Sequence, residues 1–71
     1  MQYIELDIKL DQIAPFSEII IAKLDEINFE TFQEYDRGVR CYIDSKKLDK
    51  KKTKLVLDEI SKKTKLAYSF N

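Results

Sequence analysis

The chain has 71 residues, with no histidine, one cysteine (Cys41) and one glycine (Gly38), and its thirteen basic and thirteen acidic side chains give a formal net charge of zero. These residues cannot supply a zinc site of cysteine and histidine, an intrachain disulfide, or a Cys-His or Ser-His nucleophile pair. A Gly-rich phosphate or dinucleotide loop needs several glycines and is excluded as well. The length allows one thin core, so we expect no catalytic residue, cofactor pocket or metal site.

The charge is divided unevenly between the two halves of the chain. Residues 1–36 carry nine acidic side chains and two lysines, whereas residues 37–71 carry eleven basic and four acidic side chains. Such an asymmetry can steer a charged partner, although ordinary solvated faces also carry charge runs. The longest apolar run, residues 19–22, is far shorter than the ~20 residues of a membrane span. With no leader-like start, we expect a cytoplasmic, reduced protein without membrane contact.

The first predicted element is a strand over residues 3–10. Apolar and polar side chains alternate there, which is the period of a strand with one buried and one wet side. The inward side chains are predicted to be Ile4, Leu6, Ile8 and Leu10. The outward side chains are predicted to be Tyr3, Glu5, Asp7 and Lys9.

A helix is predicted to begin near Pro15, which is tolerated in a first turn. Apolar residues then recur at steps of four, four and three, which makes a core-facing stripe. Ile19 and Ile21 fall on opposite flanks of this stripe, so at least one of them should be partly exposed. The stripe consists of Phe16, Ile20, Leu24 and Ile27.

Residues 29–35 and 39–43 are predicted to pair as a hairpin around Asp36, Arg37 and Gly38. Short hairpin loops often need a positive φ, which we assign to Gly38. Alternation points Arg40 and Tyr42 outward. It points Phe32, Val39, Cys41 and Ile43 inward, so Cys41 is expected to be a small buried hydrophobe.

The second predicted helix begins after Asp49, a suitable N-cap. Lysines 50–52 follow in its first turn, where the helix dipole disfavours each cation by about 0.3–1 kcal/mol. Val56 and Ile60 are predicted to anchor this helix, with Leu55 and Leu57 on its flanks. A closing strand over residues 66–70 completes the order βαββαβ.

This order predicts an α+β, ferredoxin-like domain over residues 1–71, in which two helices cover one face of a four-stranded antiparallel sheet. Both the acidic first helix and the lysine-rich second helix should lie on that face. The topology hosts many unrelated activities, so the fold alone assigns no function.

Four stretches of the chain carry a resemblance to a known family. They are Tyr3-Ile4-Glu5-Leu6, Ser17-Glu18-Ile19-Ile20-Ile21-Ala22-Lys23-Leu24, Phe29-Glu30-Thr31-Phe32 and Cys41-Tyr42-Ile43. These stretches resemble the N-terminal domain of the bacterial ribosomal protein L-eleven methyltransferase family, which often reads close to YIEL, SEILIAEL, FESF and AYI at the corresponding places. Residues 66–70 resemble its fourth strand, so the resemblance spans nearly the whole chain, but it includes no catalytic residue.

The resemblance implies a non-catalytic module that recognises a large-subunit ribosomal protein, protein eleven, for a linked methyltransferase domain that binds S-adenosylmethionine. We expect the natural gene to continue past Asn71 into that domain. The run of lysines 50–52 is not part of the family pattern. The expected contact surface is the outward face of the central strands, with acids of the first helix as steering charges. The candidate residues are Tyr3, Glu5, Arg40 and Tyr42, with Glu18 and Asp25 for steering.

Two alternatives remain, a small RNA-binding module and a self-associating or ligand-sensing one. Residues 37–43 loosely resemble the third-strand signature of an RNA recognition motif. That signature places base-stacking aromatics at its third and fifth positions, which here are Val39 and Cys41. Tyr42 lies in the opposite alternation, where it could pair with Tyr3 across adjacent strands. The sequence therefore argues against nucleic-acid binding.

Overall fold

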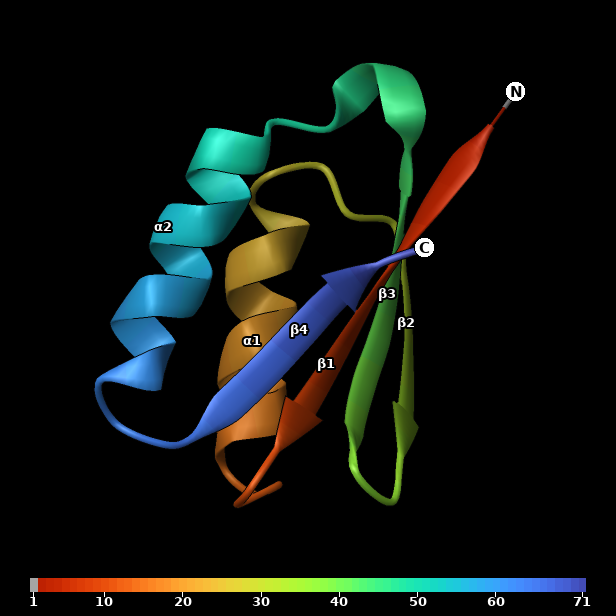
Figure 1. Ribbon diagram of the computed structural model, residues 1–71. Coiled ribbons are helices and arrows are strands. Elements are labelled where there is room, and N and C mark those ends of the chain that lie inside the picture. Colours follow the sequence, from red (N-terminus) through yellow and green to blue (C-terminus); the bar gives the residue numbers. More distant parts are fainter. Residues whose placement is uncertain (1) are drawn as a thin grey trace.

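The computed structural model describes residues 2–71 as one four-stranded sheet with two helices packed side by side on one of its faces (Figure 1). All neighbouring strands are antiparallel and their order is β2-β3-β1-β4. This is the ferredoxin-like α+β arrangement that the sequence predicts. The elements are β1 (Tyr3–Leu10), α1 (Phe16–Asp25), β2 (Thr31–Tyr35), β3 (Gly38–Asp44), a short 3-10 helix (Ser45–Lys47), α2 (Lys50–Ser61) and β4 (Leu66–Phe70).

The core lies between the helices and the face of the sheet that they cover. The predicted alternation is confirmed on both central strands, because the predicted inward side chains of β1 and β3 are all buried there except Ile4, which is partly buried. Phe32 is partly buried against the same core, as its predicted inward direction requires. The buried apolar side chains are Leu6, Ile8, Leu10, Ile20, Leu24, Phe29, Val39, Cys41, Ile43, Leu57 and Ile60.

Helix α1 begins directly after Pro15, as predicted, and buries Ile20 and Leu24 completely. Phe16 and Ile27 pack against the core but stay partly exposed. Ile19 is 37% exposed, which confirms that a flank of the stripe meets solvent.

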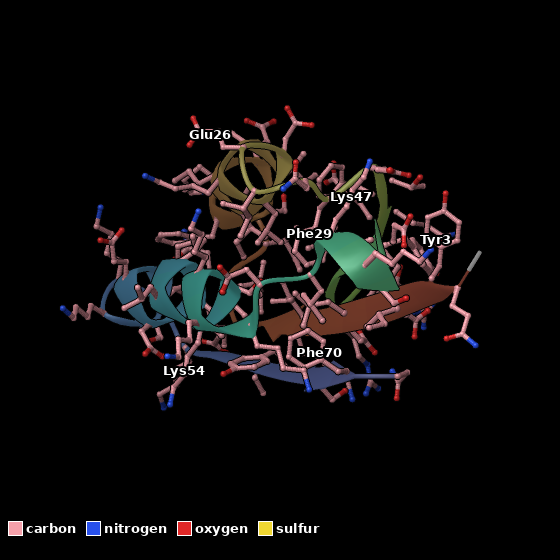
Figure 2. All side chains as sticks on the ribbon, turned by 90° about the horizontal axis from the view of Figure 1, so that it is seen from above. Tyr3, Glu26, Phe29, Lys47, Lys54 and Phe70 are labelled. Atoms are coloured by element: carbon pink, nitrogen blue, oxygen red, sulfur yellow. The ribbon has the colours of Figure 1, made fainter. Side chains whose placement is uncertain are left out.

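The end of α1 differs from the prediction, because Phe29 belongs to the helix cap and not to β2. Asn28 has a left-handed φ of 79°. The amide of Phe29 donates to the Leu24 carbonyl (3.2 Å) and that of Asn28 to the Asp25 carbonyl (3.4 Å). These two bonds form a Schellman motif, which places Phe29 against the buried Leu24. Figure 2 shows Phe29 inside, between the helices and the sheet.

The predicted positive φ of Gly38 is wrong, since Gly38 has a negative or extended φ and forms the first residue of β3. Asp36 and Arg37 alone connect the paired residues Tyr35 and Gly38. Glycine is required for a different reason: a Cβ atom here would overlap the carbonyl oxygen of Ile8 on β1. The close approach of two strands, and not the turn, accounts for the single glycine.

The predicted core stripe of α2 also needs correction. Leu57 was expected on a flank but is fully buried, and Ile60 is buried with it. Val56, a predicted anchor, is partly exposed, and Leu55 is 65% exposed. The predicted cap is confirmed, because Asp49 Oδ1 accepts a hydrogen bond from the Lys52 amide (3.1 Å). The buried stripe therefore includes a polar position, Thr53, whose hydroxyl donates to the Asp49 carbonyl (2.9 Å). A prediction that considers only apolar residues therefore places the buried side of α2 wrongly.

Candidate functional site

The face of the sheet that no helix covers carries a patterned polar surface, which we call the open face. The strand register arranges its side chains in three rows that cross the sheet from β2 to β4. The first row is Thr31, Tyr42 and Glu5, continued by Asn71. The second row is Gln33, Arg40, Asp7 and Ser69. The third row is Tyr35, Gly38, Lys9 and Ala67.

Three tyrosines on or beside this face each donate their hydroxyl to a carboxylate. Tyr42 Oη lies 2.8 Å from Glu5 Oε1, its direct neighbour across the β1-β3 pair. Asn71 Nδ2 donates to the second oxygen of the same carboxylate (3.1 Å). Tyr3 Oη donates to Glu30 Oε2 (3.1 Å) at one end of the face. Hydrogen bonds to ionised groups are stronger than neutral ones, so these pairs hold the rings and the carboxylates in place.

The third pair crosses a whole strand. Tyr35 stands opposite Gly38, yet its hydroxyl donates to Asp7 Oδ1 on β1 (2.6 Å). The ring must therefore extend over β3, where Gly38 has no side chain to obstruct it. The Arg40 guanidinium lies over this ring, with Cζ 4.3 Å from its centroid, which is a cation–π contact. Tyr35 and Arg40 thus form a layered, ordered patch at the centre of the open face.

These contacts raise the pKa of all three tyrosines. A hydrogen bond to the Glu30 carboxylate raises the pKa of Tyr3, and bonds to Asp7 and Glu5 raise the pKa of Tyr35 and Tyr42. The physical cause is the same in all three cases, since a carboxylate stabilises the protonated hydroxyl that donates to it. The open face therefore keeps its tyrosines as neutral donors well above neutral pH.

The structure brings four of the six predicted site residues together. Tyr3, Glu5, Arg40 and Tyr42 all lie on the open face, with Tyr3 at its end, 52% exposed (Figure 2). The hypothesis that Tyr3 pairs with Tyr42 is wrong, because Asp44 stands opposite Tyr3.

The other two predicted residues lie elsewhere. Glu18 and Asp25 are exposed on α1, which covers the opposite face of the sheet. They can act on a partner at the open face only through their longer-range field, which salt screens beyond about 8 Å.

Sequence reasoning missed four further members of this surface. Asp7 carried a usable signal, since alternation already pointed it outward. The pairing of Tyr35 with Asp7 was not foreseeable, because it depends on the register across three strands and on the missing side chain of Gly38. The four missed residues are Asp7, Glu30, Tyr35 and Asn71.

The carboxylates of the open face have acceptor positions left for cations. A carboxylate offers about four acceptor positions, and Asp7 uses one of them for Tyr35. Within residues 2–71 the one ion pair joins Lys47 Nζ to Glu30 Oε1 at 3.5 Å and is exposed, so it contributes little to stability. Lysine or arginine side chains of a partner could therefore bind between tyrosine rings and carboxylates.

A second surface feature lies between the helices. A cleft of about 260 Å³ separates the start of α1 from the end of α2. Phe16, Ile19 and Ile60 form its apolar part, and three lysines and one glutamate its polar part. This volume lies below the ~300 Å³ at which small-molecule sites usually begin. The polar residues are Lys23, Glu59, Lys62 and Lys63.

The single cysteine, Cys41, is free and buried in the core. Burial raises the pKa of the Cys41 thiol to about 12, so it is a poor nucleophile. Residues 2–71 contain no group of three or more cysteine, aspartate or glutamate side chains placed to hold a metal ion. In the same range, no helix is long and apolar enough to cross a membrane.

Comparison with protein-family models, curated protein sequences and solved structures finds no match to this chain.

Proposed function

We propose that this domain is a non-catalytic protein-recognition module that presents a basic ribosomal protein, large-subunit protein eleven, to a linked methyltransferase domain. The observation that carries the proposal is the set of three tyrosine–carboxylate pairs on the open face, with Arg40 layered on Tyr35. Tyrosine and arginine are enriched among residues that dominate binding energy, and ordered side chains lose less entropy on binding.

The resemblance of four sequence stretches to the methyltransferase family supports the choice of partner. Under this proposal the natural protein is cytoplasmic and has a further domain that binds S-adenosylmethionine and carries the catalytic groups. The isolated 71 residues should then bind the ribosomal protein but neither bind S-adenosylmethionine nor transfer a methyl group. A saturable, stoichiometric heat on titration with S-adenosylmethionine would contradict this division of roles.

Calorimetric titration of the chain with the ribosomal protein tests the proposal directly. Tyr42→Ala and Tyr3→Ala should each weaken binding by about 1 kcal/mol or more, the threshold above which a residue matters to an interface. Tyr68→Ala is the matched control, because Tyr68 is 37% exposed but lies on β4 with its side chain on the other side of the sheet. Equal losses for all three variants, or none, would overturn the open face as the contact surface.

The charges of α1 have a separate signature. If Glu18 and Asp25 only steer the basic partner, the double variant Glu18→Lys, Asp25→Lys should slow association and leave dissociation nearly unchanged. Stopped-flow measurement separates the two rates. A change confined to dissociation would place these acids in the contact itself.

RNA is the opposing control. Two results together would overturn the proposal in favour of an RNA-binding module. The first is tight binding of single-stranded RNA that falls steeply with salt and is lost when lysines 50–52 are neutralised. The second is the absence of any affinity for the ribosomal protein.

A further inference from the structure

The two edge strands of the sheet differ in how they are protected. Exposed edges invite pairing with other chains, and proteins commonly block them with charged side chains. β2 carries Glu34, which accepts a hydrogen bond from Ser17 on α1 (3.3 Å). β4 has the sequence LAYSF and contains no charged residue. The edge formed by β4 therefore lacks the usual protection.

The hydrogen bonds between β1 and β4 identify the free groups of this edge. Glu5 and Asn71 exchange both backbone bonds, at 3.1 and 2.8 Å. Antiparallel pairs alternate between bonded and non-bonded positions, so every second residue of β4 turns its N–H and C=O away from β1. Those residues are Leu66, Tyr68 and Phe70.

The same three residues direct their side chains to the helix side, where α2 carries lysines. Lys50 Nζ lies 5.6 Å from the centroid of the Phe70 ring. Lys54, one turn further along α2, projects toward the side of the molecule on which β4 lies (Figure 2). Neither lysine belongs to an ion pair within residues 2–71. Lys50 also opposes the dipole at the start of α2, and among residues 2–71 no carboxylate pairs with it to offset this local cost.

We propose that the β4 edge and the lysines of α2 form a docking site for an extended acidic peptide segment, which adds a fifth strand to the sheet. The free backbone groups of β4 would bind the main chain of the segment. Its side chains opposite Tyr68 and Phe70 would then stand below Lys50 and Lys54, where acidic residues are favoured. On the other side of the sheet a hollow of about 220 Å³, bordered by Ala67 and Ser69, leaves room for the alternate side chains.

The structure favours a peptide over RNA at this site. Base stacking needs open aromatic faces. Tyr68 and Phe70 meet edge to face, with centroids 6.1 Å apart, and Lys50 lies over the Phe70 ring. The pair is thus a packed surface whose unused groups are those of the main chain.

A second copy of the chain fits this edge poorly. Pairing of β4 with β4 across a two-fold axis would bring the lysines of two α2 helices together. Like charges brought close at an interface disfavour association. An acidic segment would instead be attracted by the lysines of α2.

The probe is an acetylated and amidated nonapeptide with threonine at odd positions and valine, glutamate, glutamate and valine at the even ones. Titrated into the isotopically labelled chain, it should slow hydrogen exchange of the Leu66, Tyr68 and Phe70 amides at least tenfold at saturation. The Ser69 amide already faces β1 and should change little. N-methylation of the peptide amides that face β4 should abolish the protection, because it removes the donors of the added strand.

Charge variants test the role of α2. Lys54→Glu should weaken peptide binding about fivefold, the effect expected of one exposed ion pair. Lys52→Glu is the matched control, since it makes the same charge change two residues away and off the β4 flank, and it should bind as the parent does. A peptide with lysine in place of glutamate should bind at least tenfold more weakly.

Three results would overturn the proposal. These are no protection of the three amides at millimolar peptide, protection already present through self-association without peptide, and protection by single-stranded RNA but not by the peptide.

Discussion

The two faces of the sheet are built from the same strands but have different chemistry. On the covered face β1 and β3 bury Leu6, Ile8 and Cys41 against both helices. On the open face the intervening residues, such as Glu5 and Tyr42, are held by hydrogen bonds between side chains. Burial of apolar side chains, the main source of folding energy, is thus concentrated on the covered face, so side chains of the open face can be changed for binding at little cost in stability.

The largest expected effect comes from Gly38, a residue of the open face that has no room for a side chain beside β1. Gly38→Ala should lower the free energy of unfolding by about 3 kcal/mol or more, since the new methyl group would overlap backbone that no rotamer change can move. Urea unfolding measures this, with Ser69→Ala as a control that should stay within about 0.5 kcal/mol. A loss below 1 kcal/mol for Gly38→Ala would show that β1 and β3 can separate at this point.

Helix α2 offers a matched pair of leucines on its two sides. Leu57→Ala removes a fully buried side chain and should cost about 3 kcal/mol. Leu55→Ala changes a side chain that is 65% exposed and should cost less than about 0.5 kcal/mol. Equal losses in thermal or urea unfolding would contradict the corrected orientation of α2.

The loss of stability at alkaline pH should distinguish the contribution of Cys41 on the covered face from that of the tyrosines on the open face. Burial raises the pKa of Cys41 from its ordinary value of 9.0 to about 12. The stability linked to its protonated form is present below pH 9 and is lost as pH rises toward 12, by about 3 kcal/mol at pH 11. The raised pKa values of the open-face tyrosines act with the same sign.

Two variants distinguish these contributions in unfolding measurements from pH 8 to 11. Cys41→Ala should remove most of the alkaline loss of stability, whereas Tyr42→Phe should remove only a minor part. A larger effect of Tyr42→Phe would mean that the open face contributes more to folding than its exposure indicates.

The smallest effect concerns the cap of α1. Asn28→Ala should destabilise the domain by about 1 kcal/mol, because alanine tolerates a left-handed φ poorly. Asn28→Gly should equal or exceed the parent in stability, since glycine is the usual residue at this position. Destabilisation by both variants in thermal unfolding would show that the amide side chain of Asn28 is needed.

Much of the fold could be predicted from the sequence, because alternation in β1 and β3 and the four-residue steps of α1 are strong local signals. A glycine can serve turn geometry or close strand contact, and the sequence does not distinguish the two, whereas Gly38 serves strand contact. A pattern of apolar residues misplaces Leu57, because the buried stripe of α2 includes the polar Thr53.

The open face was predictable only in part. Its four expected residues share one face by parity alone, as the sequence indicated. The tyrosine–carboxylate pairs depend on the register between strands that are distant in the chain, and alternation within one strand assigns each side chain to a face but does not identify its partner.

The most direct test of the proposed recognition role is an NMR titration of the isotopically labelled chain with the ribosomal protein. The proposal predicts chemical-shift changes at Tyr3, Glu5, Arg40 and Tyr42, with the amides of β4 unaffected. Changes centred on β4 and α2, or none at millimolar partner, would contradict it.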